Sequence, residues 1–407
     1  MKALNKITAD FDNTINDNSE IVKNIRIENF NEFKKTGIPT SKEEFWKYTD
    51  PSVVNKSEFS LGIPSNIEDK AFDIIIVNGK LIQKNGKVQI ADIQNGLEEH
   101  ILKISDFNKT NNPFINLNNA FLAEGCVINF KANSKKEIKV LNIVDNENSE
   151  QIIHPRIIVK AGKNSNISIL EEIRFLGKQK NLVNSVTNFY LEEGANVEHI
   201  IIDDFSEETY QISNVLVKQK KDSAFSSYNY SNAKNLTRKD FIVELKDSGS
   251  HCDLRGVYLA DNDNHIDHHT IIEHEKEHCT SNELYKGILS GKSTGVFNGR
   301  IHVHNDAQKT DAIQSNQNIL LSDNAKIHTK PELEIYADDV KCTHGATVGQ
   351  LDEKGIFYLR ARGIKKKEAQ KMMMRAYVGE VLSGIRNEET KNNLLEKIMR
   401  NIPEGEA

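Results

Sequence analysis

The residues with the clearest potential for metal chemistry are Cys342 and His344. If their segment is a strand, side chains two positions apart point to the same face, and the two Cα atoms lie about 6.5–7 Å apart. A thiolate and an imidazole at that separation can contact one metal ion, and together they suit soft or borderline metals, including iron in sulfur-rich surroundings. Two ligands do not fill a tetrahedral site, so we predict a half-site that a second subunit would complete.

The spacing of this pair alone does not establish a metal site. Free cysteines are commonly buried, so for an isolated Cys-x-His pattern a buried Cys342 beside a hydrogen-bonded His344 is the favoured alternative. The other cysteines lie far apart, at Cys126, Cys252 and Cys279. There is no CxxC pair, which excludes the usual zinc ribbon and redox dithiol, and we expect no disulfide framework.

A second set of possible ligands is a histidine-rich segment that ends in a cysteine: His265, His268, His269, His274, His278 and Cys279. On a strand, His268 and His274 would share one face as part of an imidazole ladder. The segment has no helical H-E-x-x-H arrangement and no clear acid/base pair. Solvated or hydrogen-bonded histidines are therefore the favoured interpretation of this segment.

One glycine-rich segment resembles a phosphate-binding loop. Residues Gly287–Ser293 read G-x-x-x-G-K-S, which is one residue too short for the phosphate-loop pattern. The residues that follow have strand character, so no helix N-terminus would present aligned amides to a phosphate. We interpret the segment as a turn and expect no nucleotide hydrolysis by this chain.

Composition and charge restrict the class of protein. The chain has 407 residues, of which 38% are hydrophobic and 28% charged, an ordinary globular composition with room for more than one packing unit. No apolar run is long enough to cross a bilayer, and a net charge of −6 gives no electrostatic reason to bind nucleic acid. The acidic amino terminus carries no apolar signal-peptide run, so we expect a cytoplasmic protein without nucleic-acid or membrane partners.

The two ends of the chain have helical patterns. Residues 1–94 predict a mixed, largely helical region, because apolar residues from Ile21 to Phe33 recur at helical spacing. Residues 363–407 predict a C-terminal helical domain, in which a broad apolar stripe is followed by a second helix that opens near Asn387. Two short helices joined in this way form a helical hairpin.

The middle, residues 95–362, predicts a mainly β region. Short β-type runs alternate with turn signals, and no convincing helical pattern lies between them. The last of these runs, Gly355–Arg360, also favours a strand. The pattern fits either a β-solenoid or a sandwich, and periodicity alone does not separate them. Examples of the turns are Ala161–Asn164, Glu193–Asn196, Lys246–Gly249 and Leu321–Asn324.

The segment from residue 285 to residue 364 resembles the SufB/SufD family of iron–sulfur cluster scaffolds. A weaker match near the amino terminus rests on Gly37–Pro39 and Phe45–Thr49. At residues 342–347 the form Cys-Thr-His-Gly-Ala-Thr is similar to the SufD side of the family, whereas SufB typically has a Glu-His-Glu-Ala type of sequence. The matching residues occur in order as Tyr285–Gly287, Val296–Gly299, Ala307–Asp311, Gln314, Asn318–Leu321, Thr329–Ile335, Asp338–Gly349, Phe357–Arg360 and Arg362–Ile364.

The resemblance implies a right-handed parallel β-helix core (a β-solenoid) flanked by an N-terminal helical region and a C-terminal helical hairpin. It also implies a non-catalytic scaffold in a complex of SufB, SufD and two copies of the ATPase SufC. This chain would pair with SufB through the β-helix and bind SufC through its C-terminal helices, a use that suits the adaptable methionine cluster at Met372–Met374.

For the site, the resemblance implies that Cys342 and His344 lie at the SufB interface, where SufB supplies the missing ligands. It implies no tightly bound cofactor, and iron or an iron–sulfur cluster would be held transiently in the complex. Whether a flavin binds in that complex, and whether the isolated chain forms a homodimer, stay open.

Three rival functions remain to be weighed. A metal-dependent enzyme that uses the histidine-rich segment would hold metal tightly and turn over without partners. A carbohydrate-binding solenoid would need exposed aromatic platforms, and aromatic residues make up only 7% of the chain. A SufB-like subunit is disfavoured by the Cys342–His344 form.

Overall fold

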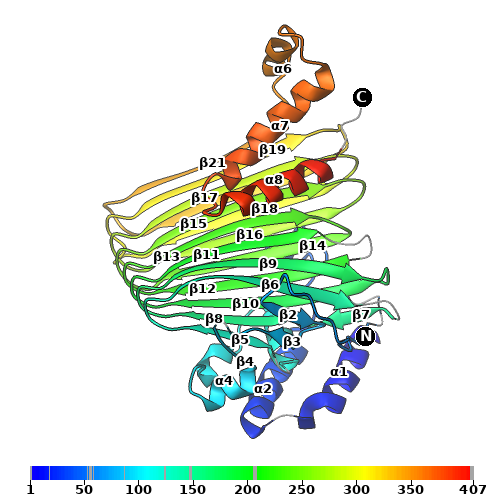
Figure 1. Cartoon of the computed structure of the whole chain (residues 1–407), viewed down its shortest axis with the longest axis vertical. Helices are drawn as coiled ribbons and strands as arrows, with labels where there is room; N and C mark the ends of the chain where they lie inside the picture. Colours follow the sequence, from blue (N-terminus) through cyan, green and yellow to red (C-terminus); the bar gives the residue numbers. More distant parts are fainter. Residues whose placement is uncertain are drawn as a thin grey trace.

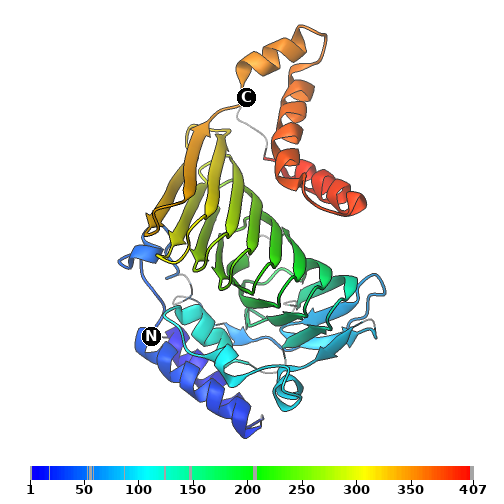
Figure 2. The ribbon, with the colours of Figure 1, turned by 90° about the vertical axis from the view of Figure 1, so that its left-hand side faces the viewer.

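The computed structural model describes residues 2–17, 19–52, 54, 57, 59–86, 88–122, 125–145, 149–204 and 209–403. Most of these residues form a solenoid of stacked strands with helices at both ends (Figures 1 and 2). The helices are α1 (Lys2–Thr14), α2 (Glu20–Thr36), α4 (Ile93–Glu98), α5 (Pro113–Ala120), α6 (Glu353–Arg360), α7 (Lys366–Leu382) and α8 (Glu388–Asn401), with short 3-10 turns at Ile15–Asp17, Glu44–Trp46 and Ile104–Phe107.

The strands follow one another through most of the chain. They are β1 (Ser60–Leu61), β2 (Ile74–Val77), β3 (Lys80–Lys84), β4 (Gln89–Ala91), β5 (Cys126–Phe130), β6 (Lys135–Asp145), β7 (Gln151–Ile153), β8 (Arg156–Ala161), β9 (Asn166–Leu176), β10 (Asn181–Leu191), β11 (Asn196–Asp204), β12 (Thr209–Gln219), β13 (Ala224–Asn232), β14 (Leu236–Leu245), β15 (His251–Ala260), β16 (His265–His274), β17 (Thr280–Leu289), β18 (Thr294–Val303), β19 (Asp311–Leu320), β20 (Lys326–Ile335) and β21 (Lys341–Gly349).

Two parallel sheets form the walls of the solenoid. Sheet A contains the even-numbered strands from β8 to β20, and sheet B contains the odd-numbered strands from β9 to β21. Each turn of the chain contributes one strand to each sheet, and each strand pairs in parallel with its counterpart in the next turn. Asn166 pairs with Asn196 near the start of the stack, and Asp311 pairs with Lys341 at its end, with the same offset along the chain. From β5 onward the predicted mainly β region is therefore a solenoid and not a sandwich. Its first residues, 95–120, instead hold the end of α4, a 3-10 turn and α5, so the expectation that this region contains no helix is wrong there.

The core of the solenoid lies between the two sheets and is built by alternate residues of each strand. Phe189 and Phe225 pack together from neighbouring turns with ring centroids 5.1 Å apart. Phe241 and Phe297 are fully buried in the same core. One turn cannot bury its own inward face, so each turn depends on the next for its stability.

The corners of the solenoid explain the polar turn residues. Asn164, Gly194, Asp222 and Gly249 lie at successive corners and all have positive φ, a conformation that glycine, asparagine and aspartate adopt most readily. At Gly194 a Cβ atom would also collide with the Asn164 side chain of the previous turn. The turns predicted at Ala161–Asn164, Glu193–Asn196 and Lys246–Gly249 are confirmed.

The N-terminal segment packs against one end and along the outer face of sheet A. The helix predicted over Ile21–Phe33 is confirmed as α2, which ends before Gly37. Farther along, Arg238 on β14 lies 3.9 Å from the Trp46 ring centroid. Asp267 accepts hydrogen bonds from Thr49 at 2.5 Å and from Arg238 at 3.2 Å. These contacts join the N-terminal segment to strands in the middle of the chain.

The C-terminal helices cover part of the outer face of sheet B. Val378 and Leu382 of α7, and Leu394 of α8, are buried against residues such as Ile200 and Leu259 of that sheet. The predicted hairpin is confirmed, with Asn387 as the N-cap of α8. No helix among the described residues is both long enough and apolar enough to span a membrane. The boundaries proposed at residues 94/95 and 362/363 stay predictions.

The strand predicted over Gly355–Arg360 is wrong, because these residues form α6. The side chain of Asp352 accepts a hydrogen bond from the backbone N–H of Lys354 and caps the helix. Only Ile356 of α6 is buried, while Phe357 and Tyr358 are exposed. Their aromatic side chains suit a strand, whereas Asp352 directly before α6 supplies a helix N-cap.

Candidate metal half-site at the end of the solenoid

Cys342 and His344 lie on β21, the last strand of sheet B. β21 pairs with β19 on one side and ends the sheet, so no strand of the described chain lies beside its other edge. Figure 2 shows this end of the solenoid, where β20 and β21 are the last strands before the chain leaves for α6. Both candidate residues therefore belong to the final turn.

The register places both side chains on the inward face. Cys342 pairs with Ala312 and His344 pairs with Gln314, and both partners on β19 are buried inside the solenoid. Side chains alternate along a strand, so Cys342 and His344 share that face. Because β21 is the last strand of the stack, Cys342 is only half-buried and His344 is exposed. The arrangement presents one sulfur and one imidazole to any subunit that would cover the end.

Burial and a neighbouring charge act on the Cys342 thiol. Burial raises the pKa of Cys342, and the Asp311 carboxylate raises it further. A hydrogen bond from the backbone N–H of Ala312 lowers this pKa by a smaller amount. The thiol is therefore held in its neutral form in the isolated chain. A bound metal ion reverses this preference, because thiolate coordination displaces the proton.

A buried carboxyl group lies two strands behind His344. Glu283 on β17 pairs in register with Gln314, which in turn pairs with His344. The Gln314 side-chain amide donates a hydrogen bond of 2.5 Å to Glu283. Burial raises the pKa of Glu283 to about 7, despite the lowering effect of that hydrogen bond. Nothing in the local sequence beyond the strand pattern indicated this residue, because its neighbours come from other turns.

The histidine-rich segment is not a shared site. His268 is buried between the Tyr258 and Tyr285 rings, and burial lowers its pKa to about 3. His274 is also buried and lies 2.9 Å from the Ser281 hydroxyl, and burial lowers its pKa to about 4. These two residues do share the inward face, as predicted.

The remaining members of this segment point elsewhere. His265 lies 2.8 Å from the Thr49 hydroxyl, and His269 pairs with Asp267 at 3.0 Å. His278 is exposed at a corner, and Cys279 is buried. Among the described residues, none of the five histidines belongs to a group of three possible metal ligands. The predicted hydrogen-bonded or solvated state therefore holds for four of the five, whereas the ring nitrogens of His268 are buried without a hydrogen-bond partner among the described residues.

A different group of ligands was missed by the sequence reasoning. Glu273 on β16, His302 on β18 and His304 just after β18 lie together on the wall of the solenoid. Glu273 and His302 belong to different turns but are paired in register. They could have been found only from the length of one solenoid turn, which places Glu273 beside His302, and no local sequence pattern gives that length.

Comparison with known proteins places the whole arrangement in one family. The family model described as "SUF system FeS cluster assembly, SufBD core domain" matches residues 142–377, and the one described as "SufBD protein N-terminal region" matches residues 2–74. The iron–sulfur cluster assembly protein SufD of Escherichia coli is 28% identical over 393 residues, covering 91% of each chain.

Two further relatives are also similar over much of the chain. An iron–sulfur cluster assembly SufBD family protein of Synechocystis is 30% identical, covering 68% of this chain and 63% of its own. A chloroplastic protein of Arabidopsis thaliana named ABCI7 is 25% identical, covering 88% of this chain and 81% of its own. The solenoid, the matched core and the matched N-terminal region lead to one conclusion: the chain belongs to the SufBD family of the SUF system for iron–sulfur cluster assembly.

Proposed function

We propose that this chain is a non-catalytic scaffold subunit that pairs with SufB and with the ATPase SufC, and that Cys342 and His344 are its half of a metal site shared with SufB. The observation that carries the proposal is the position of these two residues on the last strand. They share the inward face of the final turn of the described solenoid, so they remain reachable.

The end of the solenoid has the properties of a pairing surface. The outer edge of β21 offers backbone groups to another strand, and such edges are natural sites of pairing between chains. Large apolar side chains are exposed around it, including Val348 at 48%, Ile335 at 40% and Tyr336 at 61%. A second solenoid that covers this end would bury them and bring its own ligands to Cys342 and His344. SufB is the partner with that fold and place in the same system.

The C-terminal helices offer a second surface. Phe357 and Tyr358 of α6, and Met372 of α7, are exposed by 72%, 57% and 48%. α6 extends beyond the solenoid in Figure 1, whereas the buried side of α7 and α8 packs on sheet B. Exposed aromatic and methionine side chains on helices are typical of an adaptable protein-binding surface. We assign this surface to SufC.

The metal that passes through the shared site would be cargo. The thiol and imidazole present suit iron in the course of cluster assembly. The chain would provide one thiolate and one nitrogen, and SufB would provide the remaining ligands. ATP hydrolysis would belong to SufC. In this chain the segment Gly287–Ser293, which resembles a phosphate loop, covers the end of β17 and the turn before β18. In the part of the chain that the structure describes, no helix directly follows it to present backbone amides to a phosphate.

The variant His344→Ala tests the shared site. The reconstituted complex should assemble normally, because the side chain is exposed and its loss leaves no cavity in the core. Cluster formation, measured as iron and acid-labile sulfide under anaerobic conditions, should drop several-fold. His278→Asn removes another exposed histidine and tolerates the positive φ there, so it serves as the control. Normal cluster yield in His344→Ala would refute the role of the imidazole.

A further inference from the structure

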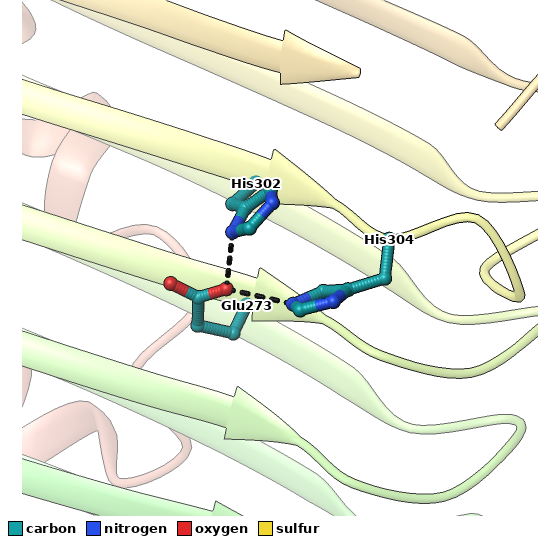
Figure 3. A group of neighbouring side chains, drawn as sticks. All are labelled: Glu273, His302 and His304. Atoms are coloured by element: carbon teal, nitrogen blue, oxygen red, sulfur yellow. Dashed lines mark hydrogen bonds and ion pairs between the residues drawn. The ribbon is translucent and has the colours of Figure 1, made fainter. Parts of the chain in front are cut away.

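A group of three ligand-type side chains lies on the outer face of sheet A. Glu273 pairs in register with His302, and their neighbours Ile272 and Ile301 are fully buried in the inward direction. Because side chains alternate along strands, Glu273 and His302 point outward. His304 follows directly after β18, and its side chain lies beside the Glu273 carboxylate on the same outer face. Figure 3 shows the three side chains converging from neighbouring turns.

The geometry of the three groups is close to that of a metal site. His302 Nδ1 lies 2.7 Å and His304 Nε2 lies 2.9 Å from the same oxygen, Oε2 of Glu273. One ligand atom from each residue falls within 4.8 Å of the other two. A tetrahedral ion with bonds of about 2.0–2.1 Å holds its ligand atoms about 3.3 Å apart. Small rotations of these side chains would therefore place all three atoms around one ion.

Charged and aromatic side chains surround the three groups. An Arg300 nitrogen lies 3.8 Å from Oε1 of Glu273, so the guanidinium faces one oxygen while the other faces the imidazoles. Arg300 also lies 3.7 Å from Glu334, which offsets part of its charge. The Tyr336 ring packs edge-on against the His302 ring, with the two ring centroids 5.4 Å apart. Neighbouring side chains of this kind help to orient metal ligands, although the positive charge of Arg300 lowers the affinity for a cation.

The group is open to solvent on one side. The side chains of Glu273, His302 and His304 are exposed by 20%, 22% and 42%. An ion could therefore enter from solution and keep water in its remaining positions. The two imidazole rings stack with centroids 4.2 Å apart, which presents their nitrogens to the same carboxylate.

We propose that Glu273, His302 and His304 bind one divalent transition-metal ion of the borderline class, such as Zn²⁺. Two imidazoles and one carboxylate suit Zn²⁺ and its first-row neighbours, and they discriminate against Mg²⁺ and Ca²⁺, which prefer oxygen ligands. The site has no thiol, lies on sheet A and faces outward, whereas Cys342 and His344 lie on sheet B and face inward. It is independent of the proposed cluster-assembly function.

A bound ion would join two turns of the solenoid. Glu273 belongs to β16, and the two histidines belong to β18 and the corner that follows it. Because the unfolded chain does not hold these three groups together, binding stabilises the folded state and raises Tm with metal concentration.

The test is a Zn²⁺ titration of the full, untagged chain carrying Cys342→Ser and His344→Ala, so that the half-site on β21 contributes nothing. Isothermal calorimetry should show one equivalent bound, and Tm should rise by several degrees. His302→Gln or His304→Gln should weaken Zn²⁺ binding at least tenfold and reduce the Tm rise accordingly. His278→Asn in the same background should bind as before. Circular dichroism checks that each variant is folded.

Two results would overturn the proposal. One is an absence of stoichiometric Zn²⁺ binding, which would leave the three residues as a hydrogen-bonded group. The other is undiminished binding in folded His302→Gln and His304→Gln variants. A Co²⁺ titration adds an independent readout, because Co²⁺ absorbs visible light far more strongly in a four- or five-coordinate protein site than as the hydrated ion. This gain in absorption should be lost with the same two substitutions.

Discussion

At the scale of single residues, position within the solenoid decides the chemistry of otherwise similar side chains. His268 is enclosed by aromatic rings and held neutral, His344 is exposed on the last strand, and His302 faces a carboxylate on the outer wall. Their local sequences do not separate these roles. These roles are decided by the turn to which each residue belongs and by the face of the strand on which it lies.

Glu283 gives a prediction for pH dependence. Its folded pKa of about 7 lies above the ordinary value of 4.5, so the folded state binds the proton more tightly than the unfolded state. Stability should therefore be greatest below about pH 4.5 as far as this group is concerned, and should decrease as pH rises toward 7. Glu283→Gln should remove this decrease, because the amide oxygen still accepts the hydrogen bond from Gln314 and carries no charge.

Urea denaturation at several pH values measures this effect. The stability difference between Glu283→Gln and the parent chain should grow from pH 4.5 to pH 7, the interval between the ordinary and folded pKa values. A constant difference across that interval would show that Glu283 is not buried as a neutral acid.

At the scale of elements, the corners limit which residues a turn accepts. Gly194 has a φ of +67°, and a Cβ there would collide with Asn164. Gly194→Ala should therefore lower the free energy of unfolding by at least about 1–2 kcal/mol, the cost of a left-handed conformation for alanine. Gly379→Ala is the matched control, because no described atom outside its own helix crowds the Cβ position and alanine should stabilise α7 by up to about 1 kcal/mol.

Chemical denaturation distinguishes the two glycine variants. The structure predicts opposite signs for them. A Gly194→Ala variant as stable as the parent would mean that the corner can relax into another conformation.

The C-terminal helices give a prediction about docking. Removal of residues after Ile364 takes away Met372 and the helix α7 against which α6 packs. It should therefore abolish SufC binding in a pulldown, although Phe357 and Tyr358 remain in the chain. The deletion also uncovers Ile200 and Leu259 on sheet B, so a milder variant is needed. Met372→Glu places a charge on an exposed part of α7 and should weaken SufC binding without loss of SufB binding. Full recovery of SufC by the truncated chain would contradict the assignment of this surface.

Sequence patterns predicted these elements unevenly. The polar corners and β-branched runs predicted a mainly β region, and apolar spacing predicted α2, α7 and α8, because these signals are local. The prediction of a strand over Gly355–Arg360 was wrong. It rested on residues that favour strands and did not take into account that Asp352 can cap a helix. The group of Glu273, His302 and His304 could not be found, since it depends on the register between turns.

At the scale of the whole molecule, the solenoid has two unlike ends. The N-terminal helices cover one end, and β20 and β21 form the other (Figure 2). The shared face of Cys342 and His344 could be predicted from their spacing, but their exposure could not, because it follows from their place in the final turn. A neutral thiol and an exposed imidazole at an open end form half of the metal site that we propose.

The most direct test compares three anaerobic samples after supply of iron and sulfide: this chain alone, SufB with SufC, and the assembled complex. The proposed shared site predicts that the complex holds more iron and acid-labile sulfide than the sum of the separate parts. Cys342→Ser together with His344→Ala should remove this surplus while assembly is retained. An equal surplus in that double variant would contradict the shared site.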